Sequence, residues 1–398
     1  MDYRASFPDS SRKRVGFDAR WYNDSGVGTY VSELVRAIGG MDRPFELIVY
    51  EDPKNPVPGL DDFPIVRIPM RSPKYSLSEQ WEFGRRTRQD HLDLLHSPFY
   101  VMPVAAGCPV VVTVHDLIPF LFKTRRWAKQ QAVKAAYRMA ARRAQHFMAV
   151  SRSTAADLEH VLGVAPERIS VVHNGVSRDW FRPEADKGEI DYLSSRWGVR
   201  PPYFMAASAH NWATKNLETA LRALRLARTA AGVNFQTIVY GPSDGVAAAG
   251  GVARWPDLNL MCPGYVSRSD LAALFRHATA FIMPSLYEGF GLPALEAMSC
   301  GCPVVVSNCG SLPEIVGEAG QVFHPNDFEG MARALSDFLL NSSAAEFWRA
   351  SALRRSMDFS WTKAASQTVA AYQAAGLGLN VRSPNREVLT SRVVGGSL

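Results

Sequence analysis

The sequence lacks a long apolar run, a low-complexity segment and a recognisable secretion signal. No stretch of about 20 apolar residues could span a bilayer, because the best candidate, residues 109–122, is interrupted by His115 and Asp116. The first 14 residues are polar and basic without an apolar centre, so we expect no signal peptide and a cytoplasmic location. These absences favour a globular protein over a membrane-spanning or secreted one.

The sequence has only five cysteines, and an odd number without a secretion signal predicts free thiols. Cys300, Cys302 and Cys309 are close in sequence, but no histidine or further cysteine completes a tetrahedral metal site there. An Asp-x-Asp motif in a pocket-like context is also missing, since Asp61 and Asp62 lie in a polar loop ahead of a strand. We therefore expect no bound metal.

The length and patterning predict two α/β domains. A chain of 398 residues with 47% hydrophobic and 21% charged residues is too long for one core. Short apolar runs alternate with helical patterns, which is typical of parallel sheets. The expected strands are residues 14–18, 45–50, 65–68, 94–96, 109–114, 146–150 and 169–172, then 203–207, 234–240, 258–262, 280–283 and 303–307. Helices are expected between them, among others at residues 28–38, 151–162, 217–229 and 268–277, with a final one at 363–374.

The most informative segment is residues 284–298, where Glu288 and Glu296 stand eight positions apart. Gly289 and Gly291 lie between them and allow the backbone to approach a ligand closely. Pro293 suits the first turn of a helix, so the segment predicts a strand, a glycine-rich loop and a helix with Glu296 in or near its first turn. The N-terminus of such a helix is a ready anion site. We expect a diphosphate there, with the two carboxylates on sugar hydroxyls.

A second glycine-rich turn, with Gly26 and Gly28, also joins a strand to a helix and could hold phosphate. The third glycine of a dinucleotide-binding fingerprint would fall at Val31, which weakens that alternative. Two further side chains follow expected strands at the carboxyl edge, where open α/β sheets bind ligands. They are His115 and Lys215, and a lysine is a compact charge well suited to phosphate.

Residues 120–145 contain eight basic residues and no acidic one. An apolar helical face is expected over Val133, Tyr137, Ala140, Ala144 and Phe147. The opposite face is expected to carry Lys134, Arg138 and Arg142. Two interpretations remain open: a solvated helix, or a surface for anionic lipid or a diphosphate-linked acceptor. No aromatic stacking motif accompanies the basic residues, so nucleic acid is not expected.

The pattern E-G-F-G-L-P-x-L-E-A-M-x-x-G-x-P-V-V resembles the nucleotide-sugar site of family 4 retaining glycosyltransferases, and the resemblance extends over residues 14–376. It implies the GT-B fold, with two doubly wound Rossmann-like domains facing each other across a cleft. The implied divisions are an acceptor-binding domain at residues 1–176, a nucleotide-sugar-binding domain at 177–358, a helix crossing back at 359–378, and a mobile tail at 379–398.

The resemblance also assigns roles. It implies catalytic roles for His115, Glu288 and Lys215. It implies donor contacts from Gly26, Gly28, Gly241, Val266, Gly289, Phe290, Gly291, Leu292 and Glu296, with Glu288 on the sugar and Glu296 on the ribose. The family often has arginine where this chain has Ala209 and Thr214, so one phosphate-binding cation is missing or is supplied from elsewhere.

The motifs S-G-V-G-T-Y and V-H-D-L-I-P look most like those of bacterial mannosyltransferases of polysaccharide and O-antigen assembly. We therefore expect a hexose, with GDP-mannose favoured over UDP-sugars, to be transferred with retention to a glycan or lipid-linked acceptor, without a cofactor. Peripheral contact with the anionic inner face of the plasma membrane is expected through the basic helix. The alternatives are a nucleotide-sugar epimerase or a phosphorylase of the same fold, although no pyridoxal lysine is evident, and a non-catalytic sugar-binding protein.

Overall fold

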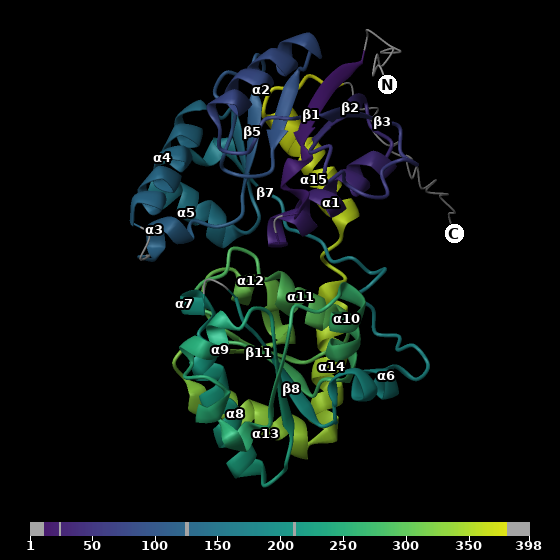
Figure 1. Ribbon diagram of the computed structural model, residues 1–398, viewed down its shortest axis with the longest axis vertical. Coiled ribbons are helices and arrows are strands. Elements are labelled where there is room, and N and C mark those ends of the chain that lie inside the picture. Colours follow the sequence, from purple (N-terminus) through teal and green to yellow (C-terminus); the bar gives the residue numbers. More distant parts are fainter. Residues whose placement is uncertain (1–11, 24, 124–126, 210–211, 380–398) are drawn as a thin grey trace, which may run out of the picture.

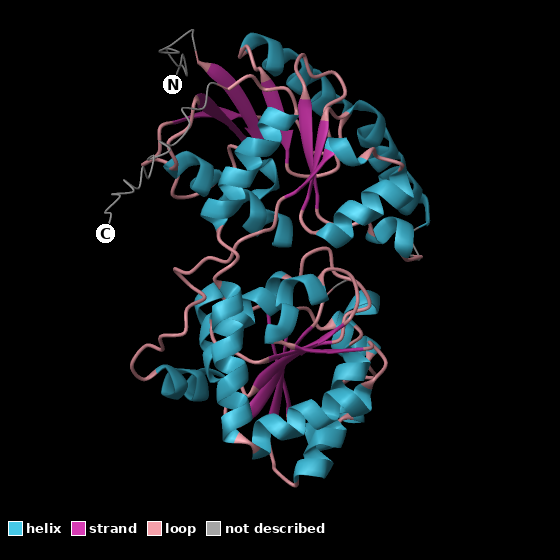
Figure 2. Ribbon diagram, turned by 180° about the vertical axis from the view of Figure 1, so that it is seen from behind, coloured by secondary structure: helices cyan, strands magenta, loops and turns pink. Residues whose placement is uncertain are grey.

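A computed structural model describes residues 12–379 except 24, 124–126 and 210–211. It contains two parallel sheets, each covered by helices on both faces (Figures 1 and 2). The strand order is β3-β2-β1-β4-β5-β6-β7 in the first sheet and β10-β9-β8-β11-β12-β13 in the second. In each sheet the strand order therefore reverses at the first strand: the next two strands lie on one side of it and the later strands on the other. This order confirms two doubly wound domains.

The first sheet lies within residues 13–171. Its strands are β1 (Lys13–Asp18), β2 (Phe45–Glu51), β3 (Ile65–Pro69), β4 (Leu94–Ser97), β5 (Val110–Val114), β6 (His146–Ala149) and β7 (Ile169–Val171). The helices of this region are α1 (Ser25–Gly40), α2 (Leu77–Gln89), α3 (Ile118–Leu121), α4 (Trp127–Arg143) and α5 (Arg152–Leu162), with the short 3-10 helices η1 (Ala19–Asn23) and η2 (Pro166–Arg168).

The second sheet lies within residues 203–323. Its strands are β8 (Tyr203–Ala207), β9 (Gln236–Tyr240), β10 (Leu260–Gly264), β11 (Ala280–Met283), β12 (Val304–Ser307) and β13 (Gln321–Phe323). The helices that follow β7 are α6 (Glu189–Trp197), α7 (Trp212–Lys215), α8 (Leu217–Ala231), α9 (Asp244–Ala248), α10 (Arg268–His277), α11 (Leu292–Ser299), α12 (Leu312–Val316), α13 (Phe328–Leu340), α14 (Ser342–Ser356) and α15 (Trp361–Ala374). Single 3-10 turns are η3 (Val252–Arg254), η4 (Pro256–Leu258) and η5 (Gly317–Ala319).

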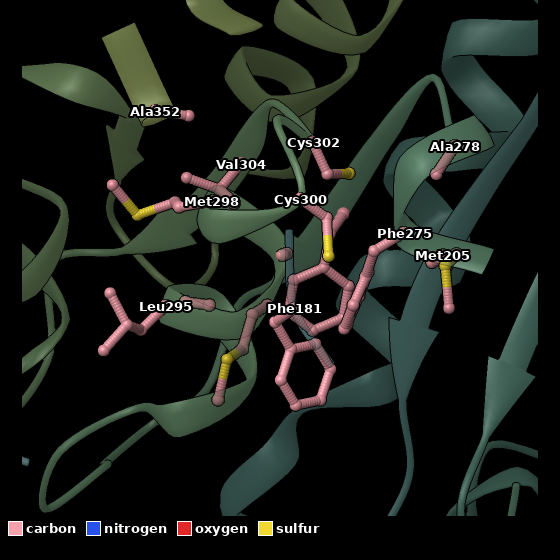
Figure 3. Packing of buried hydrophobic residues seen from close by; sticks show 14 of the residues in the cluster. Phe181, Met205, Phe275, Ala278, Leu295, Met298, Cys300, Cys302, Val304 and Ala352 are labelled. Atoms are coloured by element: carbon pink, nitrogen blue, oxygen red, sulfur yellow. The ribbon is translucent and has the colours of Figure 1, made fainter. Parts of the chain in front are cut away.

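Each sheet separates two apolar clusters, one on either face. In the second domain, α10 and α11 pack onto one face, and the side chains of Cys300 and Cys302 belong to this buried cluster, which also contains Phe181 and Phe275 (Figure 3). Their burial raises the pKa of the Cys300 thiol and raises that of Cys302 to about 12. Both cysteines therefore contribute to packing, and all five cysteines are free.

The last helix, α15, returns to the first domain and packs beside α1, as Figure 1 shows. Its Trp361, Ala365 and Tyr372 belong to the same buried cluster as Val15 and Phe17 of β1. The described part of the chain thus begins and ends in one domain and passes through the other between. No described helix is long and apolar enough to cross a bilayer.

The predicted strands all form, with ends that differ by one or two residues, and β13 was not predicted. One expectation about the basic helix is wrong: α4 ends at Arg143, and Phe147 is a buried residue of β6. Glu296 lies in the second turn of α11, because the helix begins at Leu292. No strand or helix crosses the expected division between residues 176 and 177, and the expected mobile tail falls, from residue 380 on, outside the described residues.

Candidate active site between the two domains

The site residues lie where strands of both sheets end. His115 directly follows β5 of the first sheet, whereas Lys215 ends the short helix α7 after β8, and Glu288 lies in the loop after β11. Strands β8 and β11 are neighbours at the centre of the second sheet. The carboxyl edges of both sheets are turned toward the region between the domains (Figure 1). Ligands of open α/β sheets bind at such edges, beside the point where the strand order reverses.

Lys215 and Glu288 form an ion pair, with Nζ 2.7 Å from Oε1 and both side chains largely buried. Backbone contacts fix Glu288: its carbonyl oxygen accepts hydrogen bonds from the backbone and the hydroxyl of Ser311 at 3.0 and 3.1 Å. Gly310 passes so close that a Cβ there would lie 2.5 Å from the same oxygen. The backbone of Glu288 is therefore fixed by its surroundings, and its carboxylate is held by the ion pair with Lys215.

The segment that carries Lys215 is tied to the loop that carries Glu288. The backbone amide of Leu286 donates to the carbonyl oxygen of Thr214 at 2.7 Å. The next residue, Asn216, has a left-handed backbone (φ +52°), and its side-chain amide donates to the carbonyl oxygens of Pro284 and Pro325 at 3.0 and 2.8 Å. These contacts, which connect the ends of β8 and β11, explain how the ammonium and the carboxylate meet.

The glycine-rich loop gives α11 its N-terminus. Gly291 is the N-cap in a left-handed conformation (φ +94°), and Pro293 lies in the first turn, as predicted. The ring of Phe290 is buried beside His173 and Phe359, so only the backbone of this residue can face a donor. Leu292, the first residue of the helix, is partly buried.

Gly289 touches the other domain directly. A Cβ atom at this position would lie 1.7 Å from the carbonyl oxygen of His115. The carbonyl oxygen of Gly289 accepts hydrogen bonds from the hydroxyls of Ser151 and Thr154, at the start of α5, at 2.7 and 3.2 Å. The structure therefore brings His115 of the first domain next to the Glu288 loop of the second.

His115 is a neutral imidazole in this setting. Burial lowers its pKa to about 4, and its Nε2 lies 2.9 Å from the carbonyl oxygen of Pro98. Because a carbonyl only accepts, Nε2 carries the proton and Nδ1 keeps its lone pair. The ring packs edge-on against Tyr30 of α1 at 4.8 Å. The neighbouring carboxyl group of Asp116 has a pKa raised to about 6 by burial, and it accepts from the backbone amide of Ile118.

Glu296 is a second unusual carboxyl group. Burial raises its pKa to about 8, and the only opposing influence is the positive charge of Arg268. The buried hydroxyl of Tyr240 has no hydrogen-bond partner among the described residues. Burial raises the pKa of this hydroxyl, and the charges of Glu296 and Glu288 raise it further. A buried hydroxyl without a partner, near two carboxyl groups, is a candidate contact for a polar ligand.

Arg268 links the two domains. Its guanidinium, at the start of α10, donates to Glu33 at 2.9 Å and to the hydroxyl of Thr29 at 3.2 Å, both in α1. This arginine follows an ordinary serine N-cap, so the sequence around it carries no signal of a site. Tyr240 could have been found from its position at the end of a strand, directly before Gly241.

The remaining glycines predicted to meet the donor differ in their surroundings. Gly28 is buried in α1, and a Cβ there would lie 1.9 Å from the carbonyl oxygen of Tyr22, whereas Gly26 is exposed with open space around it. Gly241 requires its glycine, because φ is +102° and a Cβ would lie 2.4 Å from the carbonyl oxygen of Ser208. Val266 is partly exposed after β10.

At the two positions where the resemblance implies arginine, this chain offers no cation. Ala209 is partly buried after β8, and Thr214 is buried, with its carbonyl oxygen bound to Leu286. Near Glu288 and Glu296, Lys215 and Arg268 supply positive charge. Within the described part of the chain, no group of three or more His, Cys, Asp or Glu side chains could hold a metal ion.

The three basic residues of α4 lie in different environments. Lys134 and Arg138 both lie over the ring of Phe120 in α3, at 5.4 and 5.5 Å from its centre, whereas Arg142 is exposed. The ring of Tyr137 packs edge-on against the same phenylalanine at 5.7 Å. The sequence pattern predicts that the basic residues lie opposite the apolar face of the helix. Instead, Lys134 and Arg138 lie beside its aromatic contacts.

Two family models match consecutive parts of the chain, one in each domain. Residues 25–180 match Glycosyltransferase Family 4, and residues 201–341 match Glycosyl transferases group 1. O-antigen chain mannosyltransferase B of Escherichia coli is 48% identical over 110 residues, which are 28% of this chain and 29% of that protein. MMP alpha-(1->4)-mannosyltransferase of Mycolicibacterium hassiacum is 31% identical over 287 residues, 68% of this chain and 66% of that protein. The chain thus spans less than two thirds of the length of these curated relatives.

Solved structures share the whole architecture at low sequence identity. Anabaena Alr3699/HepE in complex with UDP and glucose has a TM-score of 0.72 at 18% identity, covering 91% of this chain and 100% of that one. WaaG, a glycosyltransferase involved in lipopolysaccharide biosynthesis, has a TM-score of 0.68 at 16% identity, also covering 91% and 100%. These similarities and the two sheets confirm the predicted GT-B fold. The two family models, one in each domain, show that the chain belongs to the family 4 glycosyltransferases.

Proposed function

We propose that this protein transfers a hexose from a nucleoside diphosphate sugar to a glycan or lipid-linked acceptor in surface polysaccharide assembly. The observation that carries the proposal is the buried Lys215–Glu288 pair, 2.7 Å long, directly beside the loop that touches His115 of the other domain. The pair supports the proposal because a cation suited to a diphosphate, a carboxylate suited to sugar hydroxyls and the segment next to a strand-end histidine lie close together. This combination suits transfer of a sugar between two substrates that are held by different domains.

Mannose is the proposed sugar, with GDP-mannose favoured over UDP-sugars as the donor. Support comes from relatives named as mannosyltransferases, which include O-antigen chain mannosyltransferase B and the serotype-specific mannosyltransferase WbdA, 28% identical over 68% of this chain and 34% of that protein. The UDP-bound structure of similar fold belongs to a protein only 18% identical, so it bears on the fold alone.

In the proposed reaction the bond between the anomeric carbon and the diphosphate oxygen breaks, and a bond to the acceptor oxygen forms on the same face. The acceptor proton passes to the departing phosphate oxygen, so configuration is retained without a covalent enzyme intermediate. Lys215 and the N-terminus of α11 stabilise the negative charge that develops on the diphosphate. This cationic environment performs the task of a metal, and we propose that the reaction is metal-independent.

Each carboxyl group has its own proposed role. Glu288, ion-paired with Lys215, binds hydroxyls of the transferred sugar. Glu296 lies in the second turn of α11. Its proposed role is to bind the ribose, together with the hydroxyl of Tyr240. Arg268 contacts α1 and keeps a positive charge near Glu296, and it is our candidate for the phosphate-binding cation that is missing at Ala209 and Thr214.

A panel of nucleotide sugars tests this function. Thermal stability and product formation are measured with GDP-mannose, UDP-glucose and related donors, each with and without a mannose-containing acceptor. The proposal expects stabilisation by one donor and acceptor-dependent product. Release of free sugar without any acceptor favours the epimerase alternative, whereas donor binding without turnover favours a sugar-binding protein.

We also propose peripheral contact with an anionic membrane through Lys134, Arg138 and Arg142. Each basic residue near an anionic surface contributes about 1 kcal/mol, and a Debye length of about 8 Å at physiological ionic strength weakens such contacts. Binding to vesicles that contain phosphatidylglycerol should therefore decrease steeply as salt rises. Changing the three residues to glutamate should abolish it, with thermal unfolding as the check that the variant folds. Unchanged binding by this variant would refute their role.

A further inference from the structure

The first domain has an apolar groove outside the site described above. Its volume is about 770 Å³, and it lies between the start of α2, the segment after β4, and α4. These two helices are on the outer side of the first domain (Figure 1). Large apolar and aromatic side chains dominate its lining, among them Tyr75, Leu77, Tyr100, Met102, Val133 and Met139.

Several of these side chains are far more exposed than a globular fold requires. Leu77 is 89% exposed, and Trp81, one turn later on α2 and outside the lining of the groove, is 69% exposed. Met139 is 48% exposed on the facing side of the groove, in α4. Single exposed apolar residues are ordinary, but a contiguous set on two facing elements marks a surface that binds something apolar.

The charge around the groove identifies the partner. Residues 71–89 contain five basic and two acidic residues, and residues 127–143 contain five basic and no acidic residues. Both acidic residues are already engaged: Glu79 is buried against Arg20, and Glu82 accepts from the backbone amides of Arg71 and Ser72 at 3.3 and 2.8 Å. Of these basic residues Lys129 lines the groove itself, and the positive charge of the two helices that border the groove complements a layer of phosphates above hydrocarbon chains.

The groove also leads toward the catalytic region. Tyr100, at its inner end, stacks on Tyr137 with ring centres 4.1 Å apart. The hydroxyl of Tyr137 donates to the carbonyl oxygen of Asp116 at 2.8 Å, and Asp116 follows His115. A lipid surface at the groove would therefore lie on the same side of the first domain as the end of β5.

We propose that this groove inserts into an anionic lipid bilayer, with lipid hydrocarbon chains between α2 and α4 and the phosphate groups beside Lys129 and the other basic residues of these two helices. The inference extends the proposed membrane contact from the charges of α4 to an apolar insertion surface. Its purpose rests on the proposed function, because a bilayer bound there would present a lipid-linked acceptor to the domain that holds His115. The insertion itself does not depend on catalysis.

The test uses the full chain and vesicles made of equal parts of phosphatidylglycerol and phosphatidylcholine. Changing Leu77 and Met139 together to serine should weaken vesicle binding by about tenfold or more, because two large apolar side chains lose their burial. The matched control is Leu340→Ser, which removes a 63% exposed leucine from α13 of the other domain and should leave binding unchanged.

Lipids brominated on their chains give a second measurement. They should quench the fluorescence of the wild-type protein, and Trp81→Phe should remove most of that quenching, whereas Trp180→Phe, in the segment before α6, should retain it. Wild-type protein that ignores the vesicles at low salt overturns the proposal, and so does binding that the serine variant leaves unchanged. A wild-type dimer that the serine variant dissociates would assign the groove to a second copy instead. Donor turnover in lipid-free solution tests the proposed function separately.

Discussion

Gly289 and His115 belong to different domains, and a Cβ atom on the glycine would lie 1.7 Å from the carbonyl oxygen of the histidine. No side chain separates the two backbones. On the side of the first domain the contact is completed by hydrogen bonds from Ser151 and Thr154 to the carbonyl oxygen of Gly289. Contact between the domains therefore places the glycine-rich loop before α11 directly at the end of β5, where the transfer is proposed to occur.

Replacing Gly289 by alanine should force these backbones apart. Neither partner is a flexible side chain, so relief requires the domains to shift, at a cost of about 1–3 kcal/mol that is typical of overpacking. We expect kcat/KM with the true donor to fall by about tenfold or more, while thermal stability of each domain changes little. Gly378→Ala is the control, because its Cβ would meet nothing within 4 Å. Equal kcat/KM for both variants would show that the contact is dispensable.

Glu288→Ala should nearly abolish transfer and leave the fold intact. The carboxylate pairs with Lys215 and carries little packing, so its removal costs transition-state stabilisation and not the core. A loss of about 3–4 kcal/mol corresponds to a factor of several hundred in rate. The control is Glu218→Ala on α8, which breaks an exposed ion pair with Arg254. Turnover near the wild-type level in the Glu288 variant would remove this residue from the site.

Activity should survive treatment with EDTA. Lys215 and the N-terminus of α11 together supply positive charge where the diphosphate departs, and a helix N-terminus carries about half an elementary charge. The measurement is the initial rate of transfer before and after exhaustive chelation, with and without added Mg²⁺ or Mn²⁺. A strict requirement for either ion, restored on its addition, would contradict this interpretation.

Much of the site could be predicted because glycines, prolines and charged residues determine the local backbone geometry around it. Gly289, Gly291 and Pro293 define the loop and the helix start, and His115 is placed by the strand before it. Arg268 could not be predicted, because its partners Glu33 and Thr29 are more than 230 positions away and only the packing of α10 on α1 brings them together. Phe147 was misplaced on α4 because buried strands and helix faces share apolar residues.

The raised pKa of Glu296, about 8, predicts a pH dependence of stability. Between its ordinary pKa near 4.5 and about 8, the folded state holds a proton that the unfolded state has lost, so stability decreases as pH rises. The slope from this one group is at most about 1.4 kcal/mol per pH unit. Glu296→Gln should flatten the decrease, which urea unfolding over this range measures. An identical pH profile for variant and wild type would show that the carboxyl titrates normally.

Because α15 returns to the first domain, a change in the buried contacts of this helix should alter stability and not donor binding. The hydroxyl of Tyr372 lies 2.7 Å from Nδ1 of His96, whose Nε2 lies 2.8 Å from the hydroxyl of Thr113, and Thr113 also contacts the hydroxyl of Tyr30 at 2.7 Å. Burial lowers the pKa of His96 to about 3, so the imidazole is neutral and each nitrogen has one role.

Tyr372→Phe should leave Nδ1 of His96 buried without a partner. Such a group costs about 1–3 kcal/mol, and the loss should appear in the free energy of unfolding of the first domain, because α15 packs on α1 and β1. Donor binding, which is proposed to rest on the second domain, should be nearly unchanged when measured by nucleotide titration well below the unfolding temperature. Tyr265→Phe, at a 73% exposed position, is the control for loss of a hydroxyl. If the two variants have the same free energy of unfolding, the buried hydrogen bonds that connect Tyr30 to Tyr372 do not stabilise the final helix. The apolar contacts of Trp361 and Ala365 must then do so alone.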